Sequence, residues 1–281
     1  MIRLFKGCLL LSFFLCALAV PDARAGTFRV RCAYDHSAMD DPIMFPGRPG
    51  ASHMHDFFGS LDTNALSRLR SMRNAGTSCT LEGDTAGYWA PAVYRNGVKI
   101  DPEGQGPTGV DVRTLIYYSN NLDPSYNLEV PRPDLRIIAG NGHAMSYSEN
   151  PALGKEIYWG CSDNSNDELK PKTPPASCPT GIIALHIGFP NCWDGKLTHD
   201  NDTSHLVYPK RGGICPAPFT HALPRVVMRL EYPVGLKTGT ITLASGPLYT
   251  AHGDFWNTWN GRALTNVIRG CVRDGVGCGT F

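Results

Sequence analysis

Eight cysteines downstream of residue 25 constrain the fold of this chain more than any other feature of its sequence. They are Cys32, Cys79, Cys161, Cys178, Cys192, Cys215, Cys271 and Cys278. An even number of cysteines in an exported chain predicts about four disulfides. No two of them have CxxC spacing, which argues against a structural zinc site of the knuckle type. The simplest connectivity joins neighbours along the chain: Cys32–Cys79, Cys161–Cys178, Cys192–Cys215 and Cys271–Cys278.

Residues 1–25 have the organisation of a secretory signal peptide. Arg3 and Lys6 form a basic start, residues 9–20 are an apolar run, and residues 23–25 form an A-x-A cleavage site. The apolar run is too short for a comfortable membrane span. We therefore expect a secreted protein, extracellular or periplasmic, with no membrane contact after cleavage. Residues 26–281 are expected to form a single monomeric domain, large enough to bury its own core.

The charge balance argues against nucleic acid as a partner. Without residues 1–25, the chain has 23 basic and 24 acidic residues, because the signal peptide contains Arg3, Lys6, Arg24 and Asp22. Binding to a phosphate backbone requires clustered lysine and arginine, and no such cluster is present.

The pattern of residues predicts a mainly β fold. The 22 prolines and 30 glycines are spread along the chain, which favours short strands and ordered loops over long helices. Asn96-Gly97 is typical of a tight hairpin turn. Strands are predicted at 28–32, 112–118, 135–139, 156–160, 182–189, 225–232 and 240–244, and short helices at 62–76 and 264–271. We expect one loop-rich, β-sandwich-like domain with about two helices.

The run His53-Met54-His55-Asp56 carries the most distinctive chemistry. In extended chain, residues two apart point to the same side, so the two imidazoles would project together. Such a pair can bind a metal or transfer protons near neutral pH, and Asp56 could orient one of the rings. The alternative is that one histidine caps a turn while the other is a hydrogen-bonded core residue.

Four further polar residues are candidates for the same site. His252 and Asp254 are also two apart and form a second histidine–carboxylate pair. His205 precedes an apolar strand, where burial is an equally good interpretation. Asp194 lies in Cys192-Trp193-Asp194-Gly195, where it could be a general acid or base or could simply build the turn.

Aromatic residues accompany these motifs. Trp89, Trp193, Tyr208 and Trp256 are candidate sugar-stacking platforms, because an aromatic ring can pack on the apolar face of a pyranose. Burial in the core is the alternative for each of them, and is favoured for most.

Taken together, the motifs HMHDFFG, CTLEGDTAGYWAPAVY, FPNCWDG, SHLVYP and HGDFWNTW resemble one known family. It is the domain-of-unknown-function family 1996, whose members are exported proteins of fungi and bacteria. The resemblance is collinear from about Phe28 to Cys271. It implies a secreted domain, sometimes joined in other proteins to carbohydrate-binding modules, and it transfers no activity. The residues of this chain that carry the resemblance include His53, His55, Trp89, Asp194, His205, Tyr208 and Asp254.

The leading functional hypothesis is a secreted hydrolase or lyase that cleaves extracellular or cell-wall polysaccharide through a histidine–aspartate site. Its site residues would come from His53, His55, Asp56, Asp194, His205, His252 and Asp254. In one form of this hypothesis His53, His55 and His205 hold a divalent metal ion. The chain contains no G-x-S-x-G, H-E-x-x-H, P-loop or dinucleotide motif. The alternatives are a non-catalytic carbohydrate- or cell-wall-binding module and a secreted metal-binding protein.

Overall fold

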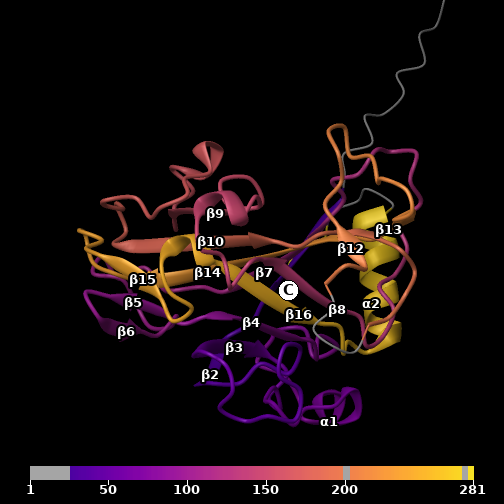
Figure 1. Ribbon diagram of the computed structural model, residues 1–281, viewed down its shortest axis with the longest axis horizontal. Coiled ribbons are helices and arrows are strands. Elements are labelled where there is room, and N and C mark those ends of the chain that lie inside the picture. Colours follow the sequence, from indigo (N-terminus) through magenta and orange to yellow (C-terminus); the bar gives the residue numbers. More distant parts are fainter. Residues whose placement is uncertain (1–25, 199–202, 274–277) are drawn as a thin grey trace, which may run out of the picture.

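A computed structural model describes residues 26–198, 203–273 and 278–281. The signal peptide predicted for residues 1–25 lies outside them. Two large sheets dominate the fold (Figure 1). The six-stranded sheet has the order β17-β1-β7-β14-β10-β9. Its strands are β1 (Thr27–Arg31), β7 (Leu115–Ser119), β9 (Ile157–Cys161), β10 (Ile182–Gly188), β14 (Arg225–Pro233) and β17 (Gly279–Thr280).

The second large sheet has five strands in the order β2-β3-β4-β16-β8. Its strands are β2 (Tyr34–Ala38), β3 (His55–Gly59), β4 (Gly87–Pro91), β8 (Arg136–Gly140) and β16 (His252–Trp256). Two three-stranded sheets complete the β structure. One contains β11 (Cys192–Trp193), β12 (Leu206–Val207) and β13 (His221–Ala222). The other contains β5 (Val93–Arg95), β6 (Val98–Ile100) and β15 (Ile241–Leu243).

The two large sheets pack face to face around the main core. Figure 1 shows β9 and β10 towards one side of the molecule and β2 and β3 towards the other. The hydroxyl of Tyr88 on β4 lies 2.7 Å from that of Tyr118 on β7. A Cβ atom on Gly253 of β16 would come within 3.0 Å of Ile187 on β10, so the absence of a side chain permits this approach. The contacts confirm the prediction of a mainly β, sandwich-like fold.

Helices are few and short, as predicted. They are α1 (Leu69–Asn74) and α2 (Gly261–Val267), which continues into a π-helical turn, η4 (Ile268–Arg273). Three 3-10 turns, η1 (Tyr147–Glu149), η2 (Asp167–Leu169) and η3 (Leu248–Thr250), complete the helical structure of the described residues.

The first helix is shorter than the predicted range of 62–76. Side chains just before it bond to nearby backbone: Thr63 Oγ1 donates to the Ser60 carbonyl (2.9 Å), and Ser67 Oγ donates to the Asp62 carbonyl. Local bonds of this kind compete with the helical ladder. Helix α1 therefore begins only at Leu69.

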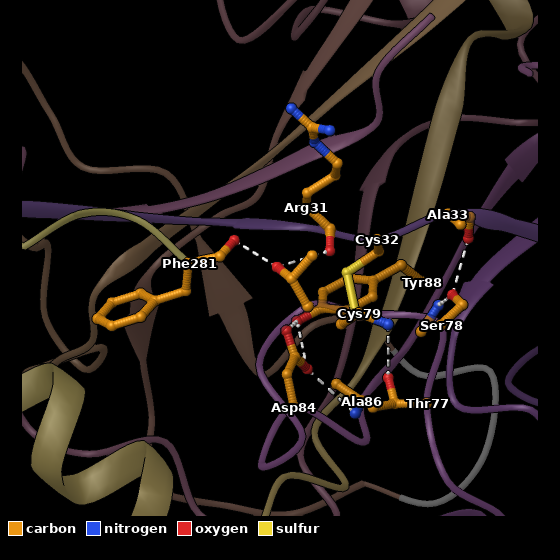
Figure 2. Close-up of a disulfide and its surroundings, with 12 residues drawn as sticks. Arg31, Cys32, Ala33, Thr77, Ser78, Cys79, Asp84, Ala86, Tyr88 and Phe281 are labelled. Atoms are coloured by element: carbon orange, nitrogen blue, oxygen red, sulfur yellow. Dashed lines mark hydrogen bonds between the residues drawn. A yellow bond between two sulfur atoms is a disulfide. The ribbon is translucent and has the colours of Figure 1, made fainter. Parts of the chain in front are cut away.

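Four disulfides join the cysteines that neighbour one another in the sequence: Cys32–Cys79, Cys161–Cys178, Cys192–Cys215 and Cys271–Cys278. Figure 2 shows the first of these. It lies beside Tyr88, whose hydroxyl donates to both carboxylate oxygens of Asp84 at 3.0 and 2.9 Å. Bridges of this kind limit the freedom of the unfolded chain. Within the described residues, no helix is both long and apolar enough to cross a membrane.

Candidate functional site

A cluster of three histidines lies on the outer face of the five-stranded sheet. Strand alternation sends Phe58 of β3 into the main core and His55 and Phe57 to the other face, where Phe57 belongs to a small separate cluster with Trp89. Strands β3 and β16 flank β4, which brings His252 towards His55. His53 lies just before β3, and its ring centroid is 4.3 Å from that of His55.

The ring nitrogens of these histidines converge. The Nε2 atoms of His53 and His55 each lie 3.3 Å from Nε2 of His252. A tetrahedral zinc ion with bonds of 2.0–2.1 Å to nitrogen separates its ligand atoms by about 3.3 Å. The spacing of the cluster therefore matches that of zinc ligands.

Backbone carbonyls determine which nitrogen carries the hydrogen in two of the three rings, those of His55 and His252. Nδ1 of His55 lies 2.9 Å from the Asp40 carbonyl oxygen, and Nδ1 of His252 lies 2.8 Å from that of Thr250. Because a carbonyl can only accept, both Nδ1 atoms donate, and each Nε2 of a neutral ring then presents a lone pair. Metal-binding histidines are usually oriented by bonds of this kind.

Protonation does not relieve the repulsion between these lone pairs near neutral pH. Burial, together with positive charge on its neighbours, lowers the pKa of His55 well below its usual value of 6.5. Burial and then the charge of His53 lower the pKa of His252 to about 3. The pKa of His53 is lowered to about 4, chiefly by burial. A metal cation between the rings would satisfy all three.

Two buried carboxylates adjoin the histidines. Asp254 Oδ2 lies 4.0 Å from Nε2 of His252. Asp254 is fully buried, neither of its carboxylate oxygens has a hydrogen-bond partner among the described residues, and burial raises its pKa well above 3.8. Asp41 accepts from the backbone N–H groups of Ile43 and Met44, both at 2.9 Å, while burial raises its pKa to about 6. Asp41, His55 and Asp254 each offer a ligand atom within 4.8 Å of the other two.

The cluster opens into a cavity of about 490 Å³. Its lining includes His53, His252, Asp41, Asp254, His143 and Glu149. Gly142 forms part of the wall, and a Cβ atom there would lie 2.7 Å from Cε1 of His252. Polar groups from four segments of the chain therefore surround one open space beside the histidines.

Asp56 points away from this cluster, which corrects the interpretation that it orients a histidine. As the next residue on β3 it faces the sandwich interior, where it accepts from Ser37 Oγ (2.6 Å) and pairs with Lys99 (3.1 Å). Strand alternation places Asp56 and His55 on opposite faces.

His205 also lies apart from the cluster, so the predicted metal set of His53, His55 and His205 is replaced by His53, His55 and His252. Its Nε2 contacts the Arg136 carbonyl at 2.8 Å, and its Nδ1 contacts Thr198 Oγ1 at 3.0 Å. Arg136 is four residues along β8 from Gly140, the partner of His252, which is about 13 Å.

Asp194 builds a turn, which was the alternative to a role as general acid or base. Its Oδ1 accepts from the backbone N–H of Lys196 at 2.9 Å, and Gly195 adopts a φ of 86°, which favours glycine. The structure does not bring it together with the histidines.

The tryptophans predicted as sugar platforms are core residues. Trp89, Trp193 and Trp256 are 0%, 2% and 1% exposed, so none offers an open ring face. Trp256 donates to Asp134 (2.7 Å) and is covered by Arg136 at 3.9 Å, while Trp193 donates to the Lys196 carbonyl (2.7 Å). Tyr208 is partly buried and donates to the Gly188 carbonyl (2.9 Å).

Two residues at the cavity were not recognised from the sequence. Asp41 lies 12 positions before His53 in Asp40-Asp41-Pro42, and His143 lies in Asn141-Gly142-His143. Neither lies on a strand, and neither has a histidine or carboxylate two positions away in the sequence. The only signal was the nearness of Asp41 to the histidine run.

A family model matches residues 41–259, under the description "domain of unknown function (DUF1996)". The chain belongs to this family. The match confirms the resemblance seen in the motifs and includes every residue of the histidine cluster and both buried carboxylates. Comparisons with curated proteins and with solved structures found no match.

Proposed function

We propose that this member of the DUF1996 family is a secreted, metal-dependent hydrolase that acts on extracellular or cell-wall polysaccharide. The observation that carries the proposal is the convergence of His53, His55 and His252 on one point, at 3.3 Å spacing, beside an open cavity. Convergence beside a cavity favours catalysis over simple metal storage, because a substrate can then reach the ion.

The histidines would hold the metal ion, and Asp254 would supply a carboxylate ligand. If zinc were held there, it would supply a bound water whose pKa is lowered to about 7, and such a water can act as a nucleophile. Asp41 has a ligand atom within 4.8 Å of His55 and of Asp254. Its carboxylate could accept a proton from the water.

Polysaccharide is proposed as the substrate class on the polar lining of the cavity. Ser52, Asp41 and Asn141 line the open space beside the histidines and can bond to sugar hydroxyls. The buried tryptophans do not support this choice. Exposed Glu149 and His143 on the cavity wall offer additional polar contacts for sugar hydroxyls.

Metal binding without catalysis is a second candidate. It is favoured by the complete burial of His55 and Asp254, both 0% exposed. A protein that only stores or carries a metal needs no exposed ligand.

One experiment separates these functions. The protein lacking residues 1–25 is stripped with a chelator, reloaded with Zn²⁺ or Mn²⁺, and incubated with a panel of fungal and bacterial cell-wall polysaccharides. We expect reducing ends only after reloading, none from His252→Gln, and normal release from His36→Gln, a partly exposed histidine on β2. Tight metal binding without product from any polymer would favour the second candidate. Equal release by wild type and His252→Gln would exclude the proposed site.

A further inference from the structure

The outer face of the six-stranded sheet carries a second polar groove. Alternate residues of these strands, such as Phe28, Tyr118 and Met228, point into the main core. Their neighbours Arg29, Tyr117 and Arg229 therefore face outwards, on the side of the sandwich opposite the histidine cavity. Two cavities there, of about 450 and 160 Å³, share the lining residues Arg29, Tyr117, Asn164 and Arg229, so they form one groove.

Two arginines of β14 leave donors unsatisfied in this groove. Arg229 is only 4% exposed; its Nη1 pairs with Glu231 and its Nη2 donates to the Ser162 carbonyl (2.6 Å). Arg225 pairs through Nη2 with Glu156 at 2.5 Å. The Nε atoms of both arginines are buried and have no partner among the described residues. A guanidinium N–H can only donate, so each requires an acceptor oxygen.

The groove also has a small excess of positive charge. It contains or adjoins five basic residues and four acidic ones: Arg29, Arg113, Lys170, Arg225 and Arg229, against Asp111, Glu156, Asp167 and Glu231. His186 lies in its floor, 5% exposed and stacked on Tyr158 at 4.4 Å. Its Nε2 is 3.5 Å from Asp167 Oδ1 and lacks a hydrogen bond. The chemistry favours an oxygen-rich anion.

The spacing of the donors favours an extended ligand. Arg225 and Arg229 are four residues apart on one strand, about 13 Å between their Cα atoms. A single small anion cannot contact both guanidinium groups at this separation. A chain of sugar residues with repeated acidic groups can do so while its hydroxyls and ring oxygens meet the other polar side chains.

We propose that this groove binds an anionic polysaccharide through its carboxylate or sulfate groups, at a site separate from the histidine cavity. The site does not depend on the proposed hydrolase activity. It would hold a charged polymer against the protein on the face opposite the histidine cluster.

Isothermal titration tests this with oligogalacturonate as the carboxylate probe, a sulfated dextran oligosaccharide as the sulfate probe, and neutral dextran and inorganic sulfate as references. We expect binding of at least one anionic oligosaccharide. Replacing one charge-assisted donor should weaken it by about 10-fold or more in Arg225→Gln and in Arg29→Gln. Arg29 is exposed, so its variant should fold normally.

Two control variants test whether binding is specific to the groove. Arg262→Gln removes the same charge from an exposed position on α2, and His55→Gln disrupts the histidine cluster. Both should bind the anionic probe as wild type does. The proposal is overturned if neither anionic oligosaccharide binds better than neutral dextran, or if inorganic sulfate binds as tightly as the oligosaccharides. Equal weakening by Arg262→Gln, or loss of binding in His55→Gln, would also overturn it.

Discussion

Nε2 of His55 and Nε2 of His252 face each other at 3.3 Å, although the residues are 197 positions apart in the chain. Each ring donates its Nδ1–H to a backbone carbonyl, so two lone pairs meet in a buried site. Burial keeps both rings neutral near pH 7. A bound metal ion would relieve this contact by accepting both lone pairs.

We expect the metal-free protein to bind one equivalent of Zn²⁺ or Co²⁺. His252→Gln removes one of three nitrogen ligands and should weaken binding by more than about 100-fold, beyond the effect typical of outer-shell changes. Calorimetry and the visible absorption of bound Co²⁺ measure this. His205→Gln should retain normal affinity, because His205 contacts the Arg136 carbonyl and not the cluster. An equal loss in the two variants would contradict the assignment of His252.

The metal-free protein should lose stability as the pH falls below 6.5. His252 has a pKa of about 3 when folded and about 6.5 when unfolded, so in this range only the unfolded chain takes up the proton. The contribution of His252 should therefore fall by about 1.4 kcal/mol for each pH unit between roughly 6 and 4. This contribution is measured as the difference in the free energy of unfolding between wild type and His252→Gln. Both proteins are unfolded in urea, with chelator, at several pH values. A stability difference that does not vary with pH would contradict this.

Much of the fold was predictable because the alternation of buried and outward-facing residues in a strand can be read from the sequence of that strand alone. The predicted strand at 225–232 is observed as β14 at Arg225–Pro233, with Met228 and Leu230 in the core. Asn96 and Gly97 form the predicted hairpin turn with φ angles of 51° and 81°. The helix predicted over 62–76 was too long, because Thr63 and Ser67 bond to the backbone instead.

The candidate site was predicted only in part because it depends on sheet order. Residue spacing predicted that His53 would lie beside His55 and His252 beside Asp254, and in the structure the members of each pair are close together. It could not show that β16 and β3 flank the same strand, which selects His252 and not His205 as the third histidine.

Tyr118 offers a test of the packing between the two large sheets. Its hydroxyl contacts Tyr88 (2.7 Å) and accepts from Trp259 Nε1 (2.9 Å), and both partners are buried. Tyr118→Phe should destabilise the protein by about 1–3 kcal/mol, because it leaves buried polar groups without this partner. Tyr117→Phe, one residue away on the outer face, should change stability by less than about 0.5 kcal/mol. Comparable unfolding midpoints for the two variants would show that this network contributes little.

Gly142 tests whether the cavity wall positions His252. An added Cβ would lie 2.7 Å from Cε1 and 2.9 Å from Nδ1 of that ring, too close to be tolerated without movement. Nδ1 of the ring donates to the Thr250 carbonyl, so a shift of the ring would change the direction in which its Nε2 points. Gly142→Ala should therefore weaken metal binding by about 10–100-fold, the range seen when the groups that orient a ligand are changed. Gly261→Ala, where no atom lies within 4 Å of the new Cβ, is the matched control. Calorimetric titration with Zn²⁺ measures both, and wild-type affinity in Gly142→Ala would mean that the wall adapts without disturbing His252.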